Sequence, residues 1–108
     1  MIVFIDIDET IANTPEDRNY SLSTPIIENI QKANKYYDDG HTVVYWTARG
    51  SGTGIDWYEI TKDQLDSWGV KYHDLRLGKP VYDLFIDDKA MNPSVWVEPW
   101  THKKGKIK

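Results

Sequence analysis

Short apolar runs separated by longer mixed stretches run along the chain. Residues 2–5 and 43–46 are apolar without alternation, which is typical of strands buried on both faces of a parallel sheet. Residues 70–72 and 84–86 form shorter runs and are predicted as a third and a fourth strand, with a fifth candidate at 95–97.

A first helix is predicted between the first two strands. Thr24 and Pro25 have the chemistry of an N-cap followed by proline at the first helical position. An apolar stripe then recurs at helical spacing, and Gly40 is expected to end the helix. The stripe consists of Ile26, Ile30, Ala33 and Tyr37.

A second helix is predicted over residues 55–68, between the second and third strands, with Gly69 ending it. Its expected inner positions are Trp57, Ile60, Leu65 and Trp68. Strands that alternate with single helices predict an α/β fold, a doubly wound, Rossmann-like parallel sheet flanked by helices. No repeat or linker interrupts it.

Length and composition agree with one globular domain. The 108 residues suffice for a single core, which we expect over residues 1–100, and residues 101–108 are expected to form a basic, frayed tail. There is no cysteine, so disulfides and thiolate chemistry are excluded. No apolar run is long enough to span a membrane and no basic leader opens the chain, so a cytoplasmic protein is expected.

The charge distribution disfavours nucleic-acid binding. The net charge is −4, but four of the thirteen basic residues are lysines at positions 103, 104, 106 and 108. The remaining chain has nine basic against seventeen acidic residues, a net charge of −8. Sequence-independent nucleic-acid binding needs a basic surface, so we expect neither a nucleic acid nor a membrane as partner.

Polar side chains follow the predicted strands at the point where each one ends. Asp6 and Asp8 follow the first strand, Thr47 the second, and Asp87 with Asp88 the fourth. The carboxyl ends of parallel strands share one edge of a sheet, where ligands bind. Lys79 precedes the fourth strand and can reach the same edge.

Four carboxylates at one edge would repel one another and need a cation. Lys79 supplies one positive charge. Mg²⁺ prefers carboxylate oxygens and bridges to phosphate, whereas no histidine lies near the strand ends to favour zinc. The pattern therefore predicts Mg²⁺ as the cofactor.

These residues resemble the motifs of the haloacid dehalogenase (HAD)-like superfamily of phosphotransferases. Its first motif, an apolar strand followed by Asp-x-Asp-x-Thr, is matched in full at residues 6–10. Thr47, Lys79 and the Asp87-Asp88 pair match the other three motifs, in the family's order. Neither intermotif segment has room for an inserted domain, so the chain is similar to the capless type. It is further similar to small phosphatases linked to bacterial capsule or surface-polysaccharide synthesis.

The resemblance implies a role for each motif residue. Asp6 would be the nucleophile that forms an aspartyl-phosphate, and Asp8 the general acid and base. Thr47 and Lys79 would bind the transferring oxygens. Mg²⁺ would be held by Asp6, the backbone carbonyl of Asp8, and the Asp87-Asp88 pair.

Further contacts to the phosphate are expected around this centre. The backbone N–H groups near Ile7 and Ala48 would complete the phosphate cradle. Arg49 is a candidate for binding a substrate anion, and the equal alternative is that it pairs with a surface acid.

The expected function is hydrolysis of a small phosphate monoester, with a sugar phosphate as one candidate. A phosphatase for a macromolecular phosphate is the main alternative, because an open site admits large substrates. A phospho-acceptor signalling domain would carry its acid pair at the first strand, whereas here the pair comes last. A non-catalytic binding module also remains open, as does a homo-oligomer whose second subunit covers the site.

Overall fold

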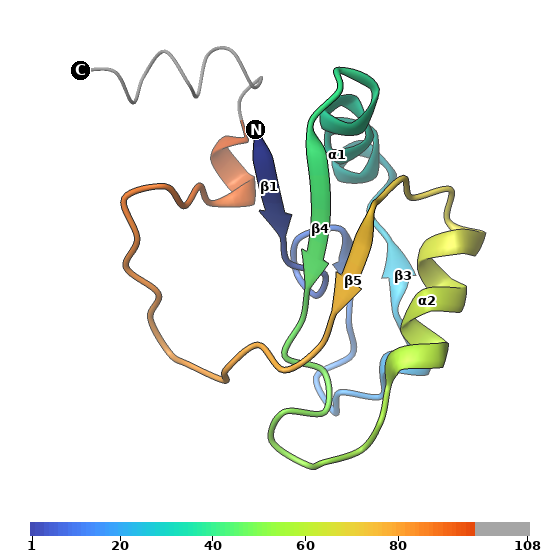
Figure 1. Ribbon diagram of the computed structural model, residues 1–108. Coiled ribbons are helices and arrows are strands. Elements are labelled where there is room, and N and C mark those ends of the chain that lie inside the picture. Colours follow the sequence, from blue (N-terminus) through green and yellow to red (C-terminus); the bar gives the residue numbers. More distant parts are fainter. Residues whose placement is uncertain (97–108) are drawn as a thin grey trace.

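A three-stranded parallel sheet forms the centre of the computed structural model, which describes residues 1–96 (Figure 1). The strands lie in the order β1 (Ile2–Ile5), β4 (Thr42–Trp46) and β5 (Asp74–Arg76). Ile5 pairs with Tyr45, and Tyr45 with Leu75, so all three strands end at one edge. This architecture confirms the α/β class.

A second, two-stranded sheet lies in the loop after β1. β2 (Ala12–Asn13) pairs antiparallel with β3 (Thr24–Pro25), and a 3-10 turn, η1 (Tyr20–Leu22), lies between them. Thr24 and Pro25 therefore pair as a strand, and their prediction as a helix start is wrong.

Helix α1 (Ile27–Asp38) follows, with Ile26 at the N-cap position. Its buried residues are Ile30, Ala33 and Tyr36, so the inner face includes Tyr36 and the expected Tyr37 is partly exposed. Gly40 has a φ of +90°, a left-handed conformation that glycine adopts without strain, and it ends the helix as predicted.

Helix α2 (Tyr58–Ser67) is shorter than the predicted helix and has a polar residue on its inner face. Thr61 and Leu65 are its buried residues, whereas Ile60, expected to face inward, is 40% exposed. The reason is a buried arginine that needs the Thr61 hydroxyl, as described below.

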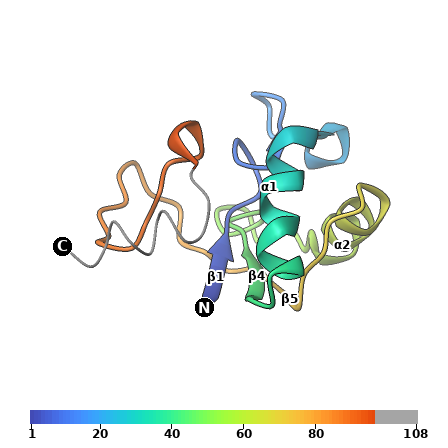
Figure 2. The same ribbon diagram turned by 90° about the horizontal axis from the view of Figure 1, so that it is seen from above.

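Both helices contribute to one core on one face of the sheet (Figure 2). Ile5, Val43 and Tyr45 pack there with Ala33 of α1 and Leu65 of α2. Right-handed crossovers explain this arrangement. The chain steps from β1 to β4 and on to β5 in the same direction, so both crossovers place their helices on the same face. A doubly wound sheet needs a reversal of this direction, and the described strands contain none.

The sequence placed the later strands wrongly. The third strand is Asp74–Arg76, not residues 70–72, although Val70 is buried in the core. Residues 84–86 form no strand: Leu84 and Ile86 are 74% and 87% exposed. An apolar run becomes a strand only where it finds an edge to pair with, and the chain after β5 leaves the sheet (Figure 1).

Val95 lies in a 3-10 turn, η2 (Pro93–Val95), rather than in a strand. Residue 97, the end of the core at 100 and the basic tail at 101–108 lie outside the described residues. Within residues 1–96, no helix has the length and apolar character that a membrane span requires.

Candidate functional site

The carboxyl edge of the sheet brings together five of the predicted site positions. Asp6 and Asp8 follow β1, and Thr47 and Arg49 follow β4. Lys79 joins them because its backbone N–H donates to the Thr47 carbonyl at 3.1 Å.

A tight turn fixes the two aspartates. The Ile7 carbonyl accepts three backbone N–H groups, from Thr10, Ile11 and Ala12, at 2.9–3.1 Å. Ile7 itself is fully buried. Because the turn is anchored in the core through Ile7, the side chains of its two neighbours are presented at the sheet edge.

Asp6 is the half-buried carboxylate of the site. Its Oδ1 accepts the Ile7 backbone N–H at 2.9 Å, and its Oδ2 lies 3.7 Å from Lys79 Nζ. Burial raises the pKa of Asp6 above its ordinary value, the Lys79 charge opposes that rise, and the nearby Asp8 adds to it. The Ile7 N–H expected in a phosphate cradle is thus engaged by Asp6.

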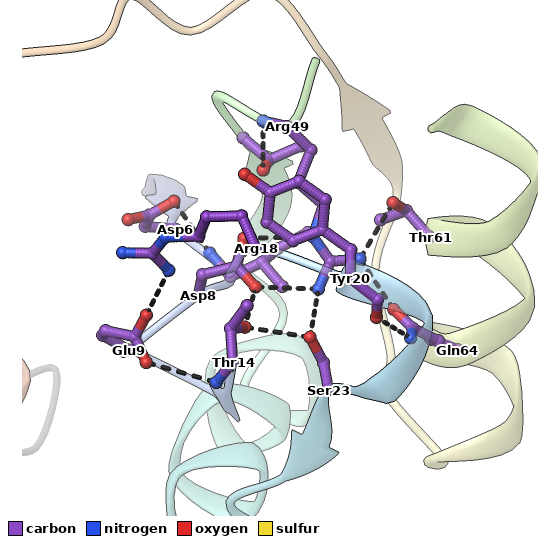
Figure 3. A network of polar contacts seen from close by, with 12 residues as sticks. Asp6, Asp8, Glu9, Thr14, Arg18, Tyr20, Ser23, Arg49, Thr61 and Gln64 are labelled. Atoms are coloured by element: carbon purple, nitrogen blue, oxygen red, sulfur yellow. Dashed lines mark hydrogen bonds and ion pairs between the residues drawn. The ribbon is translucent and has the colours of Figure 1, made fainter. Parts of the chain in front are cut away.

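Asp8 is held by a guanidinium fork (Figure 3). Arg49 Nε donates to Asp8 Oδ2 at 3.0 Å and Arg49 Nη2 to Asp8 Oδ1 at 2.8 Å. The Thr14 hydroxyl also donates to Asp8 Oδ1, and it lies 2.9 Å from the Ser23 hydroxyl. Both oxygens of Asp8 are therefore fixed in direction.

Arg49 is 1% exposed and uses all five of its N–H donors. Besides the fork to Asp8, Nη1 donates to Thr61 Oγ1 at 3.0 Å and to Gln64 Oε1 at 2.6 Å, and Nη2 reaches Ser23 Oγ at 3.4 Å. The Tyr20 ring covers the guanidinium at 4.8 Å. Arg49 thus pairs with Asp8, an acid of the site itself, and its donors are occupied by the protein; the substrate-binding role that the sequence suggests for it stays a prediction.

Thr47 and Ala48 lie where the sequence placed them. Thr47 is buried, and its Oγ1 accepts the Arg49 backbone N–H at 3.1 Å. The Ala48 carbonyl accepts the Ser51 N–H at 2.9 Å, which starts the turn of the following loop. The Ser51 hydroxyl donates to the Lys79 carbonyl at 2.7 Å and so ties this loop to Lys79.

Three aromatic rings surround the Lys79 ammonium. Its Nζ lies 5.8 Å from the ring centroid of Trp46, 5.3 Å from that of Tyr82 and 5.9 Å from that of Phe85. Ring faces attract a cation, so these contacts help to hold the ammonium close to Asp6.

Asp87 and Asp88 are not brought to Asp6 in a cluster that could hold a metal. Both are exposed, and Asp87 Oδ1 accepts the Lys89 backbone N–H at 2.8 Å. Among residues 1–96, no three acidic or histidine side chains gather closely enough for a metal ion. Within one described chain, therefore, the Asp87-Asp88 pair does not join Asp6 to complete the expected set of Mg²⁺ ligands.

Sequence reasoning missed the partners of Arg49. Thr61 and Gln64 share one face of α2, and Ser23 comes from the loop before α1. A polar residue four positions before Leu65, on the inner face of an amphipathic helix, was the available signal.

No protein-family model matches the sequence, and no curated protein does. The structure resembles a crystal structure of a target protein from Vibrio cholerae, with a TM-score of 0.83 and 24% sequence identity. The likeness covers 99% of this chain and 98% of that one. It shows that the two chains share a fold.

Proposed function

We propose that the protein is a capless, HAD-like phosphatase that hydrolyses a phosphate monoester through an aspartyl-phosphate. The observation that supports this most is the carboxylate of Asp6 at the carboxyl edge of the sheet, 3.7 Å from Lys79 and close to Asp8. A nucleophile, a cation and a second carboxylate at a sheet edge suit phosphoryl transfer.

In the first step, Asp6 attacks phosphorus through one carboxylate oxygen and the bond from phosphorus to the ester oxygen breaks. The departing alcohol takes its proton from Asp8. Lys79 offsets the repulsion between the Asp6 carboxylate and the phosphate dianion, and the buried Thr47 lies at the same edge.

In the second step, water attacks the phosphorus of the aspartyl-phosphate and Asp8 takes its proton. Phosphate leaves and Asp6 is restored. The fork from Arg49 fixes both oxygens of Asp8 in direction, so that the same group can give a proton in the first step and take one in the second.

The described carboxylates of one chain do not gather into a complete Mg²⁺ site. The proposal includes the Mg²⁺ dependence that the sequence predicts, and the experiment below compares turnover with and without the ion.

The proposed substrate is a small phosphate ester of the sugar phosphate class. Tyr20 and Trp57, whose ring centroids are 5.0 Å apart edge to face, are partly exposed, and Tyr20 also covers the Arg49 that holds Asp8. Exposed aromatic rings beside a phosphate site suit the apolar face of a sugar ring. A macromolecular phosphate is the alternative substrate.

The test is phosphate release from a panel of sugar, nucleotide and aryl phosphates, with Mg²⁺ or with a chelator. Asp6→Asn is compared with Asp56→Asn, a matched change of an exposed aspartate in the loop before α2. We expect Mg²⁺-dependent turnover that Asp6→Asn abolishes and Asp56→Asn retains. Turnover that survives in Asp6→Asn would refute the mechanism.

A further inference from the structure

The outer edge of β1 has no strand beside it within the described residues. β1 is the terminal strand of the order β1-β4-β5, and its backbone pairs with β4 alone. Ile2 and Phe4, on the sheet face away from the core, are 71% and 49% exposed. Parallel strands are normally covered on both faces, so this strand is only half-protected.

The segment between Lys79 and η2, residues 80–92, is the complementary feature, and we call it the arm. Its apolar side chains lie outside the core, with Val81, Leu84 and Ile86 at 72%, 74% and 87% exposure. Figures 1 and 2 show the arm extending away from the sheet on the β1 side. Residues 84–86 have strand-forming side chains and no strand partner.

The arm is too short to become a parallel strand of its own sheet. β5 ends at Arg76, at the carboxyl edge, and only residues 77–83 separate it from residue 84. A parallel strand must start again at the opposite edge, and such a crossover takes a dozen or more residues. Lys79 shortens the connection further, because its bond to Thr47 keeps the chain at the carboxyl edge.

We propose that two copies of the chain exchange arms, so that residues 84–86 of each copy pair in parallel with β1 of the other. If Asp87 lies beside the partner's Asp6, then Phe85 lies beside the partner's Phe4. Asp87 and Asp88 then follow the added strand at the same edge as Asp6. This part of the inference rests on the proposed function. The exchange brings together, from two copies, the group of acidic side chains for Mg²⁺ that one described chain lacks.

The added strand also supplies the missing reversal of direction in the sheet. It would lie beyond β1, on the side opposite to β4. Ligands of open α/β sheets bind where the strand order reverses, and here that point is the end of β1, which carries Asp6.

The exposed apolar area of β1 and the arm is large enough for a stable dimer interface. Ile2, Phe4 and five residues of the arm are exposed apolar side chains on each copy. At roughly 100 Å² each, they would contribute on the order of 1,400 Å² over two copies, within the range of about 1,200–2,000 Å² of specific interfaces. Reciprocal exchange closes with two-fold symmetry, so it does not propagate into fibres. The fold likeness to the Vibrio cholerae protein spans 99% of the chain and thus includes the arm.

A cross-linking experiment tests the exchange without any activity. In the proposed register Ile2 faces the partner's Asp83, and the chain has no cysteine of its own. We expect the double variant Ile2→Cys/Asp83→Cys to form a disulfide-linked dimer on mild oxidation, because neighbouring strands lie within disulfide reach. A reductant should cleave this link. The control Ile2→Cys/Glu59→Cys, whose second site is exposed on α2, should form no covalent dimer. A disulfide within one chain, or a protein that sediments as a monomer, would overturn the proposal.

A complementation experiment then tests the shared site. Asp6→Asn and Asp87→Asn chains are co-expressed with different tags, and the mixed dimer is purified through both. Exchange leaves one of its two sites intact, so we expect about half of the wild-type rate from two inactive parents. A mixed dimer as inactive as its parents would contradict the shared site. If the wild type hydrolyses no ester, the proposed function fails, while the cross-link still decides the exchange.

Discussion

At the residue scale, the chemistry of the site depends on how Asp6 is solvated. Its carboxylate is withdrawn from water, which raises its pKa, and Lys79 3.7 Å away is the main opposing influence. A nucleophile that is poorly hydrated and still charged is more reactive than one in water, at a cost to stability.

Asp6→Asn is therefore expected to stabilise the fold at neutral pH. The pKa of Asp6 is raised in the folded state, so its ionised form lowers the free energy of unfolding at neutral pH. This destabilisation disappears as the pH falls through the ordinary carboxyl range and Asp6 is protonated in both states. We expect the melting temperature of the variant to exceed that of the wild type by a few degrees at pH 7 and to match it near pH 3. A variant less stable at pH 7 would contradict this interpretation.

Arg49 is a positioning residue in this account, since it acts through Asp8. Lysine keeps the charge but lacks the planar fork that reaches both Asp8 oxygens. We expect Arg49→Lys to lower kcat roughly 100-fold with little change in KM, because a displaced acid-base group fails in chemistry rather than in binding.

A comparison of substrates with different leaving groups distinguishes the positioning of Asp8 by Arg49 from a purely structural role of Arg49. An aryl phosphate needs little protonation of its leaving oxygen, so the loss should be smaller on it than on an alkyl phosphate. Arg76→Lys, which changes an exposed arginine paired with Asp74 at 2.8 Å, is the control and should keep wild-type kinetics. An equal loss on both esters would indicate that Arg49 only supports the fold.

At the element scale, the loop after β4 carries Thr47 and Arg49 and is tied to Lys79 through the Ser51 hydroxyl. Gly50 has a φ of +82°, and a Cβ there would lie 2.1 Å from the Ile55 carbonyl oxygen. Gly52, in the same loop, has open space around it.

We expect Gly50→Ala to destabilise the fold by about 1–3 kcal/mol. Gly52→Ala should stay within about 0.5 kcal/mol of the wild type. Equilibrium unfolding in urea measures both, and equal effects of the two substitutions would show that the close approach at Gly50 is not a constraint.

The central strand β4 contains a buried hydroxyl group that lowers the stability of the fold. The Tyr45 side chain is fully buried and its hydroxyl has no hydrogen-bond partner among residues 1–96, whereas the Tyr36 hydroxyl accepts Trp96 Nε1–H at 3.3 Å. An unsatisfied buried hydroxyl costs free energy, so Tyr45→Phe should raise the free energy of unfolding by about 1 kcal/mol. Tyr36→Phe, which removes a partner, should lower it. A destabilised Tyr45→Phe protein would mean that the hydroxyl is satisfied.

The elements show what sequence could and could not predict. β1, β4 and the ends of both helices at Gly40 and Gly69 followed from local chemistry, since apolar runs and left-handed glycines act over a few residues. The clustering of Asp6, Asp8, Thr47 and Lys79 followed from the shared edge of parallel strands.

What sequence missed depends on long-range partners. The buried role of Arg49 was not visible because its partners lie up to 41 residues away. The sequence predicts residues 84–86 as a strand of the same sheet, because an apolar run does not reveal which strand it pairs with.

At the scale of the whole molecule, the helices cover one face of the sheet, and each of its edge strands, β1 and β5, pairs on one side only within residues 1–96. Two crossovers in one direction place both helices over the core, and the arm carries its apolar residues and two acids away from the edge that they would complete. The proposed exchange of arms accounts for both features, because the arm of each copy becomes the strand that pairs with β1 of the other copy.

The most direct test of the central claim is to trap the covalent intermediate on Asp6. Borohydride reduces an acyl-phosphate to an alcohol, so protein quenched during turnover and treated with it should carry homoserine at position 6. The account predicts this modification in the wild type with substrate, its absence without substrate, and its absence in Asp6→Asn. Turnover with an unmodified Asp6, or with the modification at another aspartate, would contradict it.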